Sequence, residues 1–386
     1  MIKVIHILCV SSLLFFPFIL KSQDLVTFEF SYPSGLPKQK FKGYLENADT
    51  IRQGPYSSYH NNGRLKQEGF YKDNKPDSIW ITYFQSGARQ SLFNYKYGLR
   101  NGDFSFWNQD ATIYQTGYYK HDKLTGTLKT YYSSGQIEAE SEYLNGMLNG
   151  NSKVFSVDGK RRLVAEYKND TLNGNWESYY ESGELNYKGI KKGNKYQGTL
   201  ISYYKNGQIQ RIADYQNGVI HGKVNGYYPS GAKMIESEYD YGHLVNDYLE
   251  YHENGVISEK GQYLNDKKDG QWESYYPNSV RHSIGNFKNG LLDGLWLVYH
   301  PNGFIKQHGA YLNGKAAGFW YYFNEKGLLV LNGLYIENSF QGVWTTFYPD
   351  GKVAGRINYV NGEKTGPLWV YDQTGLVTRK IELEVK

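Results

Sequence analysis

The 386-residue sequence contains one cysteine, Cys9, so the chain can form no internal disulfide framework. It also lacks a GxSxG turn, a phosphate-binding Walker loop and an HExxH helix, the local patterns of common hydrolases, nucleotide-binding proteins and zinc proteases. Its net charge of +5 comes from dispersed basic residues, which argues against nucleic acid as a partner. No segment shows helical periodicity over three turns, so we expect no helical domain.

Long apolar runs are missing except at the N-terminus. There Lys3 precedes a 17-residue, mostly apolar run from Val4 to Leu20, and Ser22 follows near a plausible cleavage point. This pattern predicts a cleaved secretory signal peptide over residues 1–22. A retained membrane anchor is the alternative, although the run is at the lower length limit for spanning a bilayer and contains Pro17. We therefore expect a secreted, periplasmic or envelope-associated protein that contacts membranes only peripherally.

Tyrosine and glycine are abundant instead, with 39 and 43 residues, and aromatic residues make up 17% of the chain. A conventional core for a chain of this length would need more leucine, isoleucine and valine. Amphipathic tyrosines can supply half-buried area in a thin structure. The composition therefore favours a thin, repetitive architecture over a large globular core.

A 24-residue repeat organises most of the chain. With Gly54 as position 0, twelve of the 14 sites reached in steps of 24 are glycine, and so are twelve of the 14 sites at position 9. Position 5 is aromatic in every repeat, and position 17 is aromatic in twelve of 14. An irregular first unit precedes this array, because the return from Gly35 to Gly54 takes 19 residues instead of 15. Atypical end units are usual in repeat proteins.

Each repeat predicts one β-hairpin. Segments such as WESYY (residues 176–180) are rich in strand-forming residues, and turns such as PNG and NG follow at fixed positions. The expected fold is all-β, an elongated single-sheet solenoid of tandem antiparallel hairpins with about 28 strands. The expected organisation is a signal peptide (1–22), an atypical capping repeat (23–53), tandem repeats (54–375) and a C-terminal capping strand (376–386).

Positions 2 and 5 are both aromatic although they have opposite parity on a strand. Either a bulge re-aims one of them, or both faces of the sheet carry aromatic side chains. Glycine recurs at position 15, as at Gly69, Gly261, Gly309 and Gly333. We expect it to leave room for a neighbouring ring to lie over the backbone.

The pattern GxWxxYYxxG followed by YxNGxxxG resembles the MORN repeat in its bacterial variant form, and in particular the YwqK-family antitoxin repeats. The segments that carry the resemblance best are residues 173–183, 269–279, 293–303 and 341–351, and it extends over roughly residues 26–380. The resemblance implies the fold and a non-enzymatic role in interactions.

Candidate catalytic groups do not converge in this pattern. His60, His252 and His300 occupy position 6, where other repeats have tyrosine, so we interpret them as substitutes for tyrosine. Glu177 and Glu273 would lie about eight strands apart, too far for an acid–base pair, and we expect them on a solvated strand face. We therefore expect no catalytic residues, no cofactor and no bound metal ion.

Tryptophan is unevenly distributed. It occupies position 2 in four consecutive repeats, and a platform of these rings would bind a glycan, a peptide or a partner's strand. The alternative is that the rings pack the sheet itself. The candidate binding surface comprises Trp272, Trp296, Trp320, Trp344, Tyr276, His300 and Tyr348.

The leading hypothesis is a non-enzymatic, secreted or envelope-associated scaffold or adaptor that binds another protein along an extended aromatic β surface. One alternative is an antitoxin or immunity-type neutraliser of a partner toxin. Another is a carbohydrate-binding surface protein, so a glycan remains a possible ligand at this point.

Overall fold

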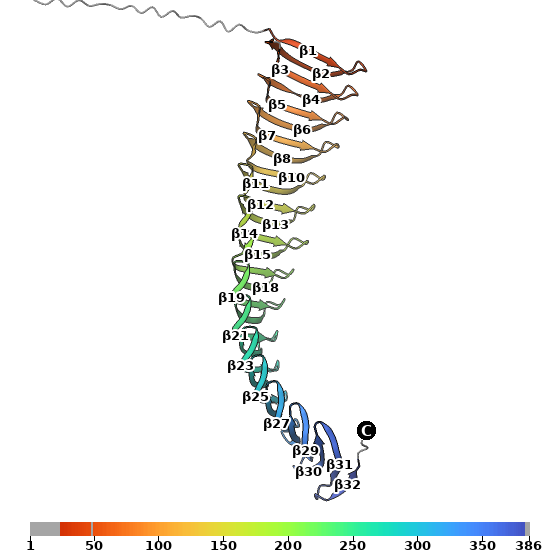
Figure 1. Cartoon of the computed structure of the whole chain (residues 1–386), viewed down its shortest axis with the longest axis vertical. Coiled ribbons are helices and arrows are strands. Elements are labelled where there is room, and N and C mark those ends of the chain that lie inside the picture. The colour runs from red at the N-terminus through yellow and green to blue at the C-terminus, as the bar shows by residue number, and fades with distance from the viewer. Residues whose placement is uncertain (1–23, 48, 383–386) are drawn as a thin grey trace, which may run out of the picture. The chain divides into compact units, whose positions relative to one another are not determined.

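A computed structural model describes residues 24–47 and 49–382. These residues form 32 β-strands and no helix, and the strands belong to one antiparallel sheet (Figure 1). The predicted all-β, single-sheet fold of tandem hairpins is therefore confirmed. The predicted signal peptide lies outside the described residues, and within them no helix is long and apolar enough to cross a membrane.

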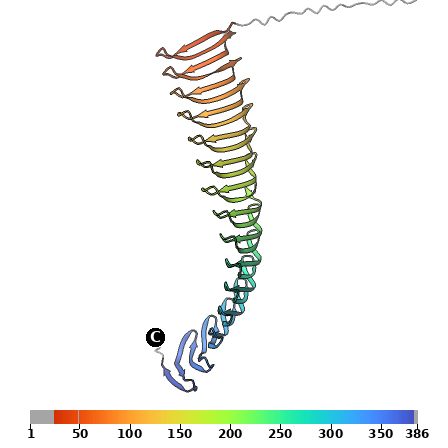
Figure 2. The ribbon, with the colours of Figure 1, turned by 180° about the vertical axis from the view of Figure 1, so that it is seen from behind.

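The first compact unit comprises residues 24–135 with 144–146. Within it each hairpin pairs antiparallel with the next in chain order, as Figure 2 shows from behind. Its strands are β1 (Val26–Ser31), β2 (Pro37–Glu46), β3 (Asp49–Tyr59), β4 (Leu65–Lys72), β5 (Lys75–Tyr83), β6 (Arg89–Lys96), β7 (Leu99–Trp107), β8 (Ile113–Lys120), β9 (Lys123–Leu124) and β10 (Gly126–Tyr131).

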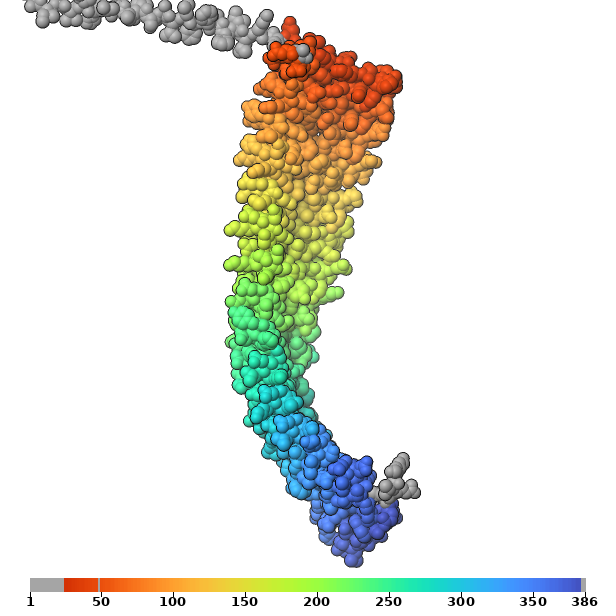
Figure 3. Space-filling view, viewed as in Figure 1, coloured from red at the N-terminus to blue at the C-terminus, as the bar shows by residue number. Residues whose placement is uncertain are grey.

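The second compact unit comprises residues 136–143 and 147–382 of the described chain. The same hairpin pairing continues within it, and the space-filling view shows its repeats following one another in chain order (Figure 3). Its strands are β11 (Ile137–Leu144), β12 (Met147–Phe155), β13 (Arg161–Lys168), β14 (Thr171–Tyr179), β15 (Leu185–Lys192), β16 (Lys195–Tyr196), β17 (Gly198–Tyr203), β18 (Ile209–Gln216), β19 (Val219–Tyr227), β20 (Lys233–Asp240), β21 (His243–Tyr251), β22 (Ile257–Leu264), β23 (Lys267–Tyr275), β24 (Arg281–Lys288), β25 (Leu291–Tyr299), β26 (Ile305–Leu312), β27 (Lys315–Phe323), β28 (Leu329–Ile336), β29 (Ser339–Phe347), β30 (Val353–Val360), β31 (Glu363–Tyr371) and β32 (Val377–Ile381).

The irregular first repeat differs from the others in strand length. β2 has 10 residues and β3 has 11, whereas the equivalent strands β4 and β5 have 8 and 9. The four additional residues therefore extend both strands of this hairpin by two residues each.

The register of β5 and β6 explains how both aromatic positions are used. Trp80 pairs with Phe93 and Thr82 with Ser91, but Tyr83 pairs with Arg89, so the extra residue of the bulge lies in β6. The alternation from Trp80 to Tyr83 is therefore unbroken, and these two residues lie on opposite faces. We call these the tryptophan face and the tyrosine face, and both carry aromatic side chains.

A second irregularity recurs where one repeat meets the next. Glu68 pairs with Ile81 and Phe70 with Asp77, so Gly69 alone faces residues 78–80. The backbone at position 0 takes up the extra length in the left-handed region, with φ of 113° at Gly54 and 63° at Ser78. Position 0 is therefore usually glycine because only glycine adopts this conformation without steric cost.

Candidate functional site

The tryptophans of position 2 lie over the glycines of position 15 in the preceding repeat. A Cβ atom built on Gly261 would overlap the indole of Trp272, and one on Gly309 would overlap the indole of Trp320. The same holds for the pairs Gly69–Trp80, Gly285–Trp296 and Gly333–Trp344. The prediction that glycine leaves room for a neighbouring ring is therefore confirmed.

Burial of these rings decides between the two interpretations of the tryptophan row. Trp272 and Trp320 are each 2% exposed, Trp344 is 4% exposed, and Trp296 is half-buried. The ring of Trp272 also packs edge-on against Tyr263, with centroids 5.1 Å apart. The indoles form the core of the tryptophan face, so these four candidate residues pack the sheet and present no open aromatic platform.

The other three candidate residues join neighbouring first turns. The hydroxyl groups of Tyr276 and Tyr348 donate hydrogen bonds of 2.9 and 2.7 Å to the carbonyl oxygens at position 5 of the next repeat. His300 places Nε2 at 3.0 Å from the carbonyl oxygen of Phe323, the equivalent contact. His60 and His252 make the same contact in their own repeats. The interpretation of histidine as a substitute for tyrosine is therefore confirmed.

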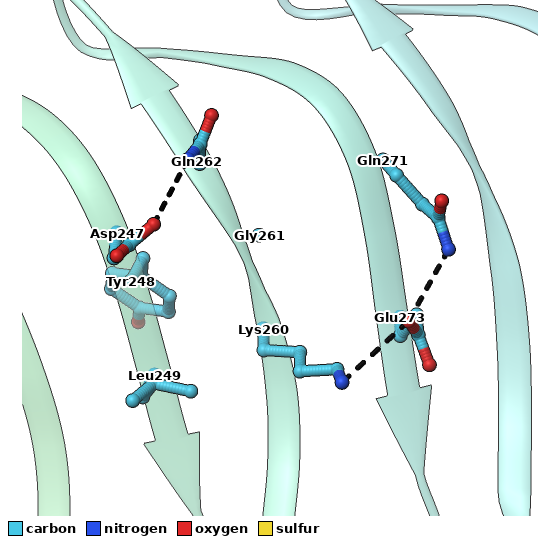
Figure 4. Close-up of a pocket in the computed structure, with 8 residues that line it drawn as sticks. All are labelled: Asp247, Tyr248, Leu249, Lys260, Gly261, Gln262, Gln271 and Glu273. Atoms are coloured by element: carbon cyan, nitrogen blue, oxygen red, sulfur yellow. Dashed lines mark hydrogen bonds and ion pairs between the residues drawn. The ribbon is translucent and has the colours of Figure 1, made fainter.

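The tyrosine face carries a polar hollow of about 410 Å³ between β21 and β23 (Figure 4). Glu273 lies at one side of it, with its carboxylate 3.6 Å from Nζ of Lys260 and 2.9 Å from Arg281. The hydroxyl of Tyr275 and the amide of Gln271 also donate to this carboxylate.

These contacts correct the expectation of a solvated carboxylate, because the Glu273 side chain is only 13% exposed. Burial alone would raise its pKa, but the hydrogen bond from Tyr275 and the charges of Lys260 and Arg281 hold the pKa below its ordinary value. The equivalent Glu177 accepts a 2.7 Å hydrogen bond from Tyr179 and pairs with Lys188 at 3.4 Å. Both carboxylates are thus paired with cations on the tyrosine face.

Two further histidines contact side chains of a neighbouring strand. His308 stacks against Tyr321 and Phe323, with centroids 4.9 and 5.7 Å away, and burial lowers its pKa. His282 lies 3.0 Å from the hydroxyl of Ser274. Among the residues that the structure describes, no three His, Cys, Asp or Glu side chains are grouped so that they could hold a metal ion.

A surface that sequence reasoning missed lies on the tyrosine face of β25–β29, and we call it the C-terminal apolar face. Leu295, Phe319 and Val343 occupy position 1 of three successive repeats and are 55%, 59% and 52% exposed. Leu312 and Ile336 at position 18 are 62% and 53% exposed. Leu295 and Phe319 are cross-strand partners of Ala310 and Leu334, so the apolar area continues across the strands.

The sequence does contain a signal for this surface. In earlier repeats of the second unit, position 1 holds Asn151, Asn175 and Thr199, and position 18 holds Lys168 and Lys192. Both positions become aliphatic or aromatic together only near the C-terminal end of the array. The tryptophans at position 2 are the more conspicuous feature, but they are on the opposite face.

The repeat is similar to a known repeat family. Seven segments match the family described as MORN repeat variant, namely residues 52–73, 124–145, 172–190, 196–217, 244–265, 268–289 and 340–361. No curated protein matches the sequence.

Solved structures with some similarity include Tc toxin components. A crystal structure of TcdB2-TccC3 without its hypervariable C-terminal region is 11% identical, covers 92% of this chain and 23% of that chain, and has a TM-score of 0.17. A Photorhabdus luminescens Tc holotoxin pore is 10% identical, with 94% and 25% covered and a TM-score of 0.15. This chain thus spans about a quarter of the length of those chains.

Proposed function

We propose that this chain is a non-enzymatic scaffold that binds another protein on its C-terminal apolar face. The observation that carries the proposal is the group of neighbouring, more than half-exposed apolar side chains on β25–β29, headed by Leu295, Phe319 and Val343. Contiguous exposed apolar patches on otherwise polar proteins mark interaction sites, because their burial removes apolar surface from water.

The composition of these strands supports the assignment. The five strands contain only three formally charged residues, Asp293, Lys306 and Lys315. A docking partner would therefore desolvate few charges, and desolvated charges weaken binding when they lose their partners. The hydrogen-bonded sheet already fixes the backbone of this face, so little backbone entropy is lost when the partner docks.

The chemistry of the face also indicates the kind of partner. Leucine, phenylalanine and valine side chains on a sheet face are complementary to another protein's apolar surface. The seven matches to the MORN repeat variant support an interaction role. The apolar run of residues 4–20 supports export, and we propose that the scaffold acts outside the cytoplasm or at the cell envelope.

The test is quantitative affinity capture from the native cells with the wild type, one double variant and one single variant. Leu295→Thr/Phe319→Thr keeps strand-forming residues but removes the apolar surface. Ile79→Thr is the matched control, because Ile79 also occupies position 1 and is 52% exposed but lies in the first unit. We expect the proteins enriched by the wild type to be lost with the double variant and retained with Ile79→Thr.

Equal recovery of the same proteins by all three forms would contradict the proposed surface. Fractionation of the same cells tests the proposed location. The mature protein is expected in the secreted or envelope fraction, and quantitative retention in the cytoplasm would contradict export.

A further inference from the structure

The tryptophan face contains a groove of about 650 Å³ over β15–β20, away from the C-terminal apolar face. It occurs where small residues interrupt the tryptophan row. Position 2 holds Leu200 and Val224 here in place of tryptophan, and the side chain of Ile235 lies over Gly226 at position 4. Ala213 and Val224 are 2% and 3% exposed, so they form a buried apolar floor.

Tyrosines form the walls of this groove. Five of its lining residues are tyrosine, namely Tyr187, Tyr196, Tyr204, Tyr215 and Tyr239. Trp176 of β14 packs against Tyr187 and Tyr196, with ring centroids 6.2 and 5.8 Å away. Tyr248 restores an aromatic residue at position 2 on β21. The groove is therefore of limited length, and its volume is in the range of small-molecule sites.

The charge of the groove is of one sign. Arg211 lines it, no aspartate or glutamate does, and in the part of the chain that the structure describes Arg211 forms no ion pair. Lys191 lies beside the wall, 4.6 Å from the ring centroid of Tyr196. The nearby acidic residues Asp214 and Glu236 occupy positions 16 and 14, which belong to the tyrosine face.

We propose that this groove binds a small amphipathic anion. A flat apolar ring system packs on the floor of Ala213 and Val224 between the tyrosine walls, and its carboxylate or sulfonate pairs with the guanidinium of Arg211. Apolar cavities with a few placed polar groups bind ligands in this way, and arginine is well suited to carboxylates because its planar group forms two parallel hydrogen bonds.

The test titrates the full-length protein with 2-naphthoate and with uncharged 2-naphthalenemethanol in a calorimeter. Arg211→Gln removes the charge, and Arg162→Gln on β13, outside the groove, is its control. The double variant Ala213→Gly/Val224→Trp fills the groove with the Gly–Trp pair that packs elsewhere in this sheet, for example at Gly261 and Trp272.

We expect one site for 2-naphthoate in the wild type and in Arg162→Gln. Arg211→Gln is expected to weaken 2-naphthoate about tenfold, a typical loss for one charge-assisted hydrogen bond, and to leave 2-naphthalenemethanol unchanged. The filled variant is expected to lose both ligands.

Three results would overturn the proposal: no binding to the wild type, unchanged 2-naphthoate affinity in Arg211→Gln, or unchanged affinity in a folded, groove-filled variant. If the filled variant does not fold, the comparison of Arg211→Gln with Arg162→Gln decides alone. Binding of an acidic, phenylalanine-containing peptide without binding of 2-naphthoate would identify a peptide site and also overturn it.

Discussion

Replacing Gly261 by alanine should destabilise the repeats around it, because the new methyl group would overlap the indole of Trp272. Gly261 does not have a left-handed φ, so alanine introduces no backbone strain at this site. A glycine-to-alanine change without strain normally stabilises a protein by about 0.4–1 kcal/mol, because it restricts the unfolded chain. The overlap with Trp272 should therefore change the stability in the opposite direction.

The surroundings of Trp272 set the magnitude. The ring is 2% exposed, lies 5.1 Å from Tyr263, and has Nζ of Lys268 at 3.8 Å from its centroid. Its Nε1 donates a 3.1 Å hydrogen bond to the carbonyl oxygen of Gln262, so the indole cannot shift without losing that bond. Overpacking costs typically about 1–3 kcal/mol and a lost hydrogen bond about 1 kcal/mol. We expect Gly261→Ala to lower local stability by about 2–4 kcal/mol.

A double-mutant cycle isolates this contact. Trp272→Val places valine at position 2. The chain itself has valine there at Val224, and the preceding repeat then has Ala213 instead of glycine at position 15. In the Trp272→Val background, Gly261→Ala should therefore cost less than about 1 kcal/mol, with a coupling energy above 1 kcal/mol.

Native-state hydrogen exchange of the amides of β22–β24 is the suitable assay, because repeat arrays open locally and a single global unfolding energy is not defined for them. Equal costs of Gly261→Ala in both backgrounds would refute the reasoning. A gain in protection in the single variant would refute it as well.

Three further predictions concern turns, backbone and charge. His300→Phe should lower local stability by about 1 kcal/mol, because the hydrogen bond to the Phe323 carbonyl is lost, whereas His300→Tyr should be nearly neutral. Hydrogen exchange of the amides of β25–β27 distinguishes the two variants, and equal protection in both would contradict the turn contact. Ser78→Gly should raise local stability by about 1 kcal/mol, because Ser78 has a φ of 63°, and unchanged or lower hydrogen-exchange protection of the β4–β6 amides would count against strain there. The pKa of Glu273 is lowered from 4.5, so its stabilisation is present above that pH and is lost as the pH falls through the lowered pKa. The stability difference between wild type and Glu273→Gln should therefore shrink between pH 7 and pH 3, and a constant difference would contradict the assignment.

The repeat period and turn chemistry were sufficient to predict the hairpins, because glycine, aromatic and turn residues recur at fixed positions. The room at position 15 was also predictable, because a glycine inside a strand often marks a close approach. One predicted strand is split into β9 and β10, and another is split into β16 and β17. The irregular first repeat adds β1 and β2, so the structure has 32 strands instead of about 28.

The candidate site was harder to predict, because aromatic residues occupy both faces of the sheet. Tryptophan is equally suited to an exposed platform and to a core, and only the cross-repeat contact with glycine shows that Trp272 and Trp320 are buried. Tyr276 and His300 looked like surface groups because their hydrogen-bond acceptors are 23 residues away. The exposed apolar side chains lie at positions 1 and 18, where most repeats are polar.

The division of roles between the two faces is the central claim, and hydroxyl-radical footprinting with mass spectrometry tests it most directly. The account predicts that Trp272, Trp320 and Trp344 are protected in the folded protein, while Leu295 and Phe319 are modified rapidly until the partner binds. Rapid modification of the three tryptophans together with protection of Leu295 and Phe319 in the free protein would contradict it.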